Sequence, residues 1–159
     1  MNKIIETAQN EIGVKEHPPG SNCVKYNDWF YGTEVRGSSY PWCGAFVSWV
    51  FNEAGSPLGT IDFRRGFAGC RYATQNIKKW GVQVTVPQPG DVVFFDWDGN
   101  GVFDHTGIFV RDLGGGYFES IEGNTSFKNN SNGGEGMRRA DRRYKNAIFV
   151  RPNVVKQAE

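Results

Sequence analysis

The sequence lacks a large net charge, a long apolar run and the cysteine content of a disulfide-rich protein. Its 159 residues include 18 Lys and Arg and 17 Asp and Glu, which gives a formal net charge of +1. This balance provides no broad field that would attract nucleic acid or an anionic membrane, so we expect neither as a partner. No apolar stretch approaches the roughly 20 residues needed to span a bilayer, so we expect no membrane insertion. The first residues have the pattern of an amphipathic helix rather than a signal peptide, which favours synthesis in the cytoplasm.

Cysteine is present only at positions 23, 43 and 70. Three thiols cannot all pair, and in a chain without an export signal the default state is reduced. Cys43 lies at a clear helix start, whereas Cys23 and Cys70 do not, and we interpret these two as structural. The histidines are also few: His17 lies beside two prolines, where we expect an exposed side chain, and His105 lies in a strand pattern.

Helical and strand patterns occupy different parts of the chain. Apolar residues at helical spacing predict helices over 2–13, 42–54 and 67–80, with an irregular, aromatic-rich region between the first two. Alternating apolar segments, separated by Gly- and Pro-rich turns, then predict strands over 82–86, 91–97, 103–112, 116–123 and 146–152. Helices followed by strands are typical of an α+β domain with N-terminal helices packed on a C-terminal antiparallel sheet. We expect a single domain over 1–159, with its core over about 2–152 and a short C-terminal tail.

Two further expectations concern a buried helix face and an exposed polar segment. The first helix should bury one face, made of Ile4, Ile5, Ala8 and Ile12. The long segment 126–146 has the composition of a polar loop. Its basic residues should form a solvated surface or a contact to an anionic polymer; they are Arg138, Arg139, Arg142 and Arg143.

Cys43 is the strongest candidate for chemistry, because it falls on the first turn of the helix predicted over 42–54. Unpaired N–H groups and the positive dipole end of a helix stabilise a thiolate and lower the pKa of a thiol. Cys43 can therefore be a nucleophile. A small buried apolar cysteine is the alternative interpretation.

A predicted hairpin supplies the partners that a nucleophilic cysteine needs. If the strands close with Asp112 opposite Tyr117, Gly107 lies opposite Glu122, and His105 lies opposite Asn124. A carboxylate or amide could then reach the imidazole past Gly107. A thiolate, an imidazole and an orienting polar group are sufficient for acyl transfer from an amide. The Cys43 N–H is one candidate oxyanion donor. The candidates for a second donor or for substrate binding are Tyr26, Tyr31, Tyr40 and Trp42.

These segments together resemble the CHAP family, the cysteine- and histidine-dependent amidohydrolases/peptidases that cut peptidoglycan on a papain-like fold. The matching pieces are PWCGAFVSWV at Cys43, PGDVVFFDWDGNGVFDHTGIFV at His105 and SIEGNTS at Glu122 and Asn124. The resemblance covers most of residues 5–151. It implies Cys43 as the nucleophile, His105 as the base and acid, and Glu122 and Asn124 as orienting residues.

The resemblance also implies a substrate. We expect cleavage of a peptidoglycan amide, either between muramic acid and L-alanine or within the stem peptide or cross-bridge, by a monomeric phage lysin or prophage-derived relative. Such an enzyme would reach the cell wall after holin-type release or on a virion. The alternatives are a non-catalytic wall-binding or virion structural module of the same fold, and an amidase toxin of a secretion system.

One segment has oxygen-bearing side chains at alternate positions, like the start of a calcium loop: Asp96, Asp98, Asn100 and Asp104. The twelfth position is Gly107, where an EF-hand loop needs a glutamate. Asp-Gly followed by Asn-Gly is also a hairpin-turn signature, and we favour the turn. We therefore expect no required cofactor.

Overall fold

A computed structural model describes residues 2–62 and 65–153. In these residues the helices come first: α1 (Lys3–Gln9), α2 (Lys25–Tyr31), α3 (Cys43–Glu53), α4 (Cys70–Gln75) and the 3-10 helix η1 (Ile77–Lys79). The strands follow: β1 (Gly81–Val84), β2 (Val92–Phe95), β3 (His105–Gly114), β4 (Tyr117–Thr125), β5 (Glu135–Arg143) and β6 (Ala147–Pro152). They form one antiparallel sheet in the order β1-β6-β2-β3-β4-β5. The predicted α+β class is confirmed.

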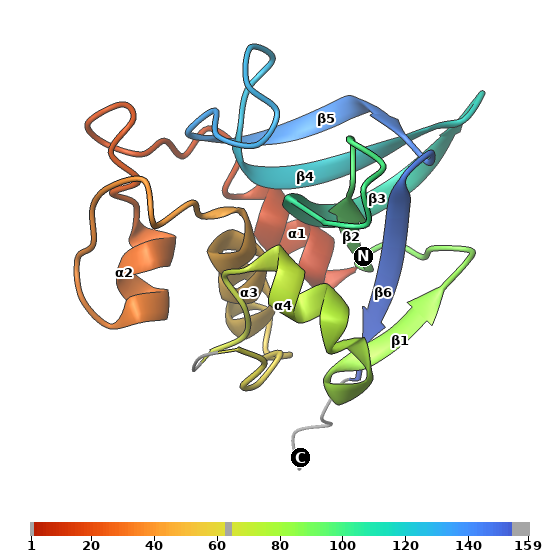
Figure 1. The fold of residues 1–159 in the computed structure, drawn as a ribbon, viewed down its shortest axis with the longest axis horizontal. Coiled ribbons are helices and arrows are strands. Elements are labelled where there is room, and N and C mark those ends of the chain that lie inside the picture. The colour runs from red at the N-terminus through yellow and green to blue at the C-terminus, as the bar shows by residue number, and fades with distance from the viewer. Residues whose placement is uncertain (1, 63–64, 154–159) are drawn as a thin grey trace.

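The helices cover one face of the sheet, with α3 packed against β3 and β4. Figure 1 shows α2 on the far side of α3 from the strands. Successive strand residues point to opposite faces, so Phe94 and Ile108 pack with the helices, whereas Phe95 and Phe109 belong to a second apolar cluster. Both faces of the sheet are therefore apolar in part, and the polar residues buried among them need partners within the protein. Within the described residues, no helix is both long and apolar enough to cross a membrane.

The N-terminal helices differ from the prediction in extent. The first helix ends at Gln9, and Ile12 is 41% exposed, so its assignment to the buried face was wrong. Asn2 caps this helix by accepting hydrogen bonds from the backbone N–H groups of Ile4 and Ile5. The irregular region predicted before Tyr40 contains the helix α2, which was missed. That helix buries Tyr26 and Phe30, four residues apart, which is a spacing that one helical turn brings together.

The segment predicted as a polar loop over 126–146 contains the strand β5, which was also missed. Its burial pattern does not alternate simply, since Arg139 and Arg142 are buried whereas Arg138 and Arg143 are exposed. The prediction of a solvated basic surface is therefore wrong for two of the four arginines. Their burial matters for the site, because each one brings a positive charge into the protein interior.

The β3–β4 hairpin pairs differently at its two ends. Near the turn Asp112 pairs with Phe118, so the predicted pairing of Asp112 with Tyr117 was wrong. Register shifts follow along the hairpin, and Ile108 pairs with Ile121, which is the register predicted for the end near His105. An ideal Cβ on Gly107 would lie only 2.5 Å from Cγ of Glu122, so the glycine is needed for this close approach.

Candidate active site

Cys43 is the first residue of α3, and its side chain is 4% exposed. The backbone N–H groups of the first helical turn have no partner within the helix, so they favour a negative charge on this sulfur. The next residue must be glycine, because a Cβ on Gly44 would lie 2.5 Å from the carbonyl oxygen of Ala68. The start of the helix is thus held against the segment that leads into α4.

His105 begins β3, and its imidazole is fully buried. Its Nε2 is 2.7 Å from Oε1 of Glu122. The other ring nitrogen, Nδ1, is buried and has no hydrogen-bond partner of regular geometry. An interaction between the Cys43 sulfur and the imidazole changes the pKa of both groups. Because Nε2 is occupied by Glu122, Nδ1 is the nitrogen left for the sulfur.

Glu122 is held by Arg142, which the sequence analysis missed. The Arg142 Nε donates to Oε2 of Glu122 at 2.7 Å, and Nη2 donates to Oε1 at 2.5 Å. Ser120 also donates a hydrogen bond to Oε2. This two-pronged arrangement fixes both the position and the orientation of the carboxylate. The chain Arg142–Glu122–His105–Cys43 therefore forms one buried sequence of contacts.

The pKa values of the site follow from these contacts. Burial raises the pKa of the Glu122 carboxyl, but the hydrogen bonds and charges of Arg142 and His105 outweigh it and lower the pKa to about 2. Burial alone would lower the pKa of His105, but its interactions with Cys43 and Glu122 raise it to about 9. The pKa of Cys43 lies well below its ordinary value, first because of a hydrogen bond from Cys70 and then because of His105. These shifts favour a thiolate on Cys43 and an imidazolium on His105.

Cys70, which we interpreted as structural from the sequence, is the first residue of α4 and lies beside Cys43. Its sulfur lies 4.0 Å from that of Cys43, although 27 positions separate the two residues in the chain. Proximity to the Cys43 sulfur, together with burial, raises the pKa of Cys70 well above its ordinary value. Cys70 is therefore the protonated partner that donates to the Cys43 thiolate. The third cysteine, Cys23, donates instead to the carbonyl oxygen of Val35 at 3.3 Å.

Aromatic rings enclose the imidazole. The ring of Phe95 stacks on His105 with centroids 5.8 Å apart, and that of Trp97 stacks at 5.5 Å. The guanidinium of Arg142 lies over both of these aromatic rings. This packing excludes water from the contact between His105 and Glu122, which strengthens the interaction.

Asn124 has a different role from the one predicted. Among the residues that the structure describes, it makes no hydrogen bond to the imidazole. Its Oδ1 accepts the N–H of Gly134 at 3.0 Å, and its Nδ2 donates to Oδ1 of Asn132 at 3.4 Å. Its backbone has a φ of 59°, in the left-handed region that asparagine tolerates better than most residues. In this structure Asn124 anchors the loop between β4 and β5, and Glu122 is the described residue that hydrogen-bonds the ring.

The aromatic candidates for substrate binding fall into two groups. The Tyr26 hydroxyl donates to Glu11 at 2.9 Å, and the Trp42 indole N–H donates to Glu16 at 3.0 Å. Both rings are fully buried, so neither is available to a substrate, and we do not retain them as binding residues. Tyr31 lies edge-to-face against Tyr40, with ring centroids 5.1 Å apart.

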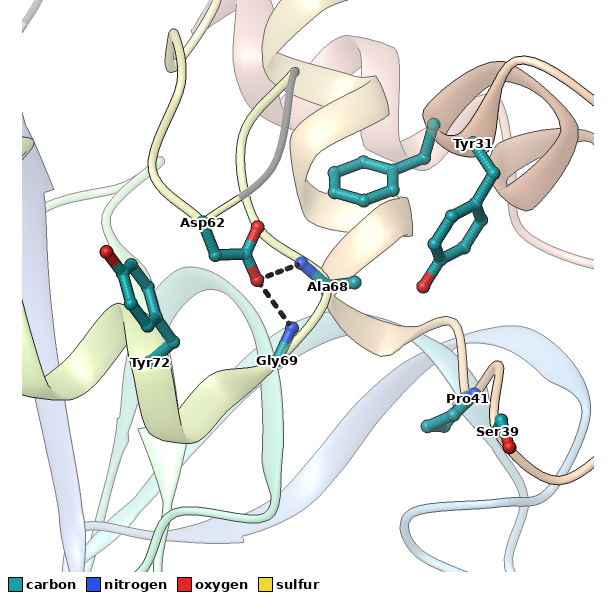
Figure 2. A pocket seen from close by; sticks show the side chains of 8 residues that line it. Tyr31, Ser39, Pro41, Asp62, Ala68, Gly69 and Tyr72 are labelled. Atoms are coloured by element: carbon teal, nitrogen blue, oxygen red, sulfur yellow. Dashed lines mark hydrogen bonds between the residues drawn. The ribbon is translucent and has the colours of Figure 1, made fainter.

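A cavity of about 410 Å³ lies between α2, the segment before α3 and the start of α4 (Figure 2). Its lining residues are Phe30, Tyr31, Ser39, Pro41, Asp62, Ala68, Gly69 and Tyr72. Pro41 lies two positions before Cys43, and Gly69 directly precedes Cys70, so the cavity lies close to both cysteines along the chain, although neither cysteine lines it. The Asp62 carboxylate shapes this wall by accepting the N–H groups of Ala68 and Gly69, as the dashed lines in Figure 2 show.

The possible calcium segment forms a turn. The carboxylate of Asp96 accepts the N–H of Asn100 at 3.3 Å and that of Gly101 at 2.7 Å. Both of its oxygens thus serve the backbone. Across residues 2–62 and 65–153, no group of three or more His, Cys, Asp or Glu side chains is placed to hold a metal ion. These residues do not fit a calcium site, and we derive no chemistry from a metal.

Comparison with known families agrees with this geometry. Residues 35–124 match the CHAP domain family, and this range includes Cys43, His105 and Glu122. The match covers more than half of the chain, so the protein belongs to the CHAP domain family. No curated protein sequence matches it. Arg142 and the rest of β5 lie outside the matched range. The residue that holds the Glu122 carboxylate therefore comes from a part of the chain that the family match does not include.

Proposed function

We propose that this CHAP-domain protein is a peptidoglycan hydrolase that cleaves an amide bond of the cell wall through a cysteine acyl-enzyme. Family membership supports an amidase or peptidase acting on peptidoglycan. The single observation that carries the mechanism is the buried contact chain from Arg142 through Glu122 and His105 to Cys43. It supports a thiolate and an imidazolium that coexist before the substrate binds, which is what nucleophilic attack on an amide requires.

In the first half of the proposed reaction, the Cys43 thiolate attacks the carbonyl carbon of the scissile amide. The carbonyl oxygen becomes an oxyanion, to which the backbone N–H of Cys43 can donate a hydrogen bond at the helix start. A donor of this kind is worth roughly 3 kcal/mol in acyl-transfer enzymes. The Nδ1–H of the His105 imidazolium then donates its proton to the leaving amine, and the C–N bond breaks. The products are a thioester on Cys43 and a free amine.

In the second half, water hydrolyses the thioester. The now neutral His105 takes a proton from the attacking water, and the Cys43 sulfur leaves as a thiolate. Glu122 keeps the ring in one orientation throughout, because its carboxylate is fixed by Arg142 and cannot rotate away. Since the pKa of Glu122 is about 2, its charge is retained during the cycle and balances the imidazolium.

The cavity between α2 and the start of α4 is the proposed site for the peptide part of the substrate. Its walls combine aromatic rings from Tyr31 and Tyr72 with small residues such as Ser39 and Gly69. Aromatic walls give large contact areas to flat peptide groups. Which peptidoglycan amide is cut depends on how the stem peptide enters this cavity.

The proposal is tested by incubating purified peptidoglycan with the wild-type protein and with Cys43→Ala, and by determining the masses of the released fragments. The wild-type protein should release fragments with a new amine end, and the variant should release none above the no-enzyme control. A Ser38→Ala variant, altered in a loop outside the contact chain, serves as the matched control and should retain activity. Equal release by the wild-type protein and Cys43→Ala would refute the thiol mechanism.

The biological setting is a further part of the proposal. We place the enzyme among the phage or prophage lysins, synthesised in the cytoplasm and reaching the wall through holin-type release or on a virion, and acting as a monomer. This setting is supported by the resemblance of the chain's segments to phage and prophage CHAP enzymes. A neighbouring holin gene would agree with this setting, whereas a neighbouring immunity gene would favour a toxin. Light scattering of the purified protein tests whether it is a monomer in solution.

A further inference from the structure

The two sulfurs of Cys43 and Cys70 lie 4.0 Å apart, and the described chain shows both cysteines free. Both side chains are buried, with exposed fractions of 4% and 6%. A disulfide requires an S–S distance of about 2.05 Å, so the sulfurs need to approach by about 2 Å, which is within the range of side-chain rotation. The mechanism above uses Cys70 only as a hydrogen-bond donor and assigns no chemistry to its own sulfur.

Backbone contacts keep the two cysteines together. The Ser48 hydroxyl, one turn after Cys43, donates to the carbonyl oxygen of Phe67 at 2.9 Å and accepts the Phe67 N–H at 3.0 Å. Gly44 lies against Ala68 so closely that no side chain would fit. These contacts fix the start of α3 against the segment that precedes α4. Neither cysteine can move away from the other without breaking them.

We propose that Cys43 and Cys70 form a reversible disulfide when the protein meets a peroxide, and that this bond switches the enzyme off while protecting its nucleophile. The inference rests on the proposed function only in that Cys43 is the nucleophile being protected. The thiolate of Cys43 attacks one oxygen of hydrogen peroxide, which forms a sulfenic acid and releases hydroxide. The Cys70 thiol then attacks the sulfenic sulfur, which forms the disulfide and releases water.

The electrons balance across these two steps. The Cys43 thiolate and the Cys70 thiol lose two electrons and one proton in total, and one peroxide is reduced to one hydroxide and one water. A thiol reductant reverses the bond by disulfide exchange and restores both thiols. Without Cys70 the sulfenic acid has no partner and continues to sulfinic and sulfonic acids, which such a reductant does not reverse. Cys70 is thus placed as a resolving cysteine for the nucleophile.

The test compares the wild-type protein, Cys70→Ala and the matched control Cys23→Ala after treatment with hydrogen peroxide and removal of the oxidant. Thiols are counted under denaturing conditions, intact masses are recorded, and linked peptides are mapped. The wild-type protein should lose two of its three thiols, with a mass decrease of about 2 Da and a peptide that joins residues 43 and 70. Cys23→Ala should form the same linked peptide. Cys70→Ala should instead gain the mass of two or three oxygen atoms.

Activity on peptidoglycan is measured in parallel, with each protein compared to its own untreated sample. Dithiothreitol should return the wild-type protein and Cys23→Ala to their untreated activity, whereas Cys70→Ala should stay inactive. Absence of the linked peptide in oxidised wild-type protein, or full recovery of Cys70→Ala, would overturn the proposal. If Cys70→Ala does not fold, Cys70→Ser replaces it, and the wild-type peptide map decides independently. If the untreated protein cleaves no peptidoglycan, the thiol counts and masses still test the disulfide.

Discussion

The arginines of β5 divide into an inward pair and an outward pair, although all four lie within six positions of the chain. Arg142 is 4% exposed and holds the carboxylate of Glu122 with two hydrogen bonds. Arg138 is 37% exposed and pairs with Glu119 at 3.1 Å. The residue type is the same, but one guanidinium is part of the buried site, whereas the other is partly exposed and reaches the Glu119 carboxylate from the surface. Burial, rather than charge, decides what an arginine does here.

The inward pair arises from an irregularity in the sheet. In a regular strand, Arg139 and Arg142 are three positions apart and would point to opposite faces. A register shift between β4 and β5 sets Arg139 opposite Ser120 and Arg142 opposite Phe118. Ser120 and Phe118 share a face, so both arginines turn toward Glu122 and the loop beside it. The shift in register therefore brings the support for the active site into place.

The largest expected difference between the two groups is in stability. Replacing Arg142 with methionine leaves the Glu122 carboxylate buried without its main partner, so the free energy of unfolding should fall by about 3–5 kcal/mol. Arg138→Met removes an ion pair whose arginine is 37% exposed and leaves Glu119 paired with Arg111, so it should cost less, about 1 kcal/mol. Urea unfolding of both variants, followed by circular dichroism, measures the difference. Similar losses for the two variants would contradict the assignment of Arg142 to a buried network.

The second prediction concerns Glu122, the group that the inward arginine holds. Glu122→Gln keeps the shape but removes the charge that orients and stabilises the imidazolium, so kcat/KM should fall by about 10²-fold. In the wild-type protein, activity should decline as pH rises through about 9, because the raised pKa of His105 keeps its proton below that value. Without the carboxylate that pKa falls, so the alkaline decline should move to lower pH.

A profile of kcat/KM against pH measures this shift, and Glu119→Gln is the matched control. Glu119 accepts from Arg138 and Arg111, whose side chains are more exposed, although its own side chain is only 6% exposed. Its removal should leave the alkaline decline in place. An unchanged profile for Glu122→Gln would show that the contact between His105 and Glu122 does not set the protonation of the ring.

The third prediction concerns the other inward arginine, Arg139. Arg139 donates to the hydroxyl of Thr125, the carbonyl oxygen of Ser126 and the side chain of Asn130, and it pairs with the half-exposed Asp141. Arg139→Met should lower the free energy of unfolding by about 1–3 kcal/mol, since it leaves buried acceptors unsatisfied.

Limited proteolysis should also cut the Arg139→Met variant faster within residues 126–134, because that loop loses its anchor. The rate of peptidoglycan cleavage should change less in Arg139→Met than in Glu122→Gln. If proteolysis is no faster than in the wild-type protein, the loop is held by Asn124 rather than by Arg139.

Local patterns predicted the parts of the site that depend on neighbouring residues. The helix at Cys43 follows from apolar spacing within a few turns, and the strand at His105 follows from alternation and flanking glycines. The contact between His105 and Glu122 followed from the hairpin register, although the pairing at the turn was wrong. Register shifts along the hairpin restored the predicted alignment near His105. That outcome depended on irregularities that no residue pattern indicates.

The sequence alone thus determined the class of the fold, the helix that presents the thiol, and the imidazole and carboxylate that lie near it. Only the tertiary structure decided that Arg142 holds Glu122, across 20 positions, and that Cys70 meets Cys43, across 27. The physical reason is that secondary structure responds to the free energy of short segments, whereas these contacts depend on how sheet and helices pack. From its neighbouring residues alone, a charged side chain such as Arg142 is predicted to lie at the surface. Its burial becomes favourable only when a distant carboxylate is placed opposite it.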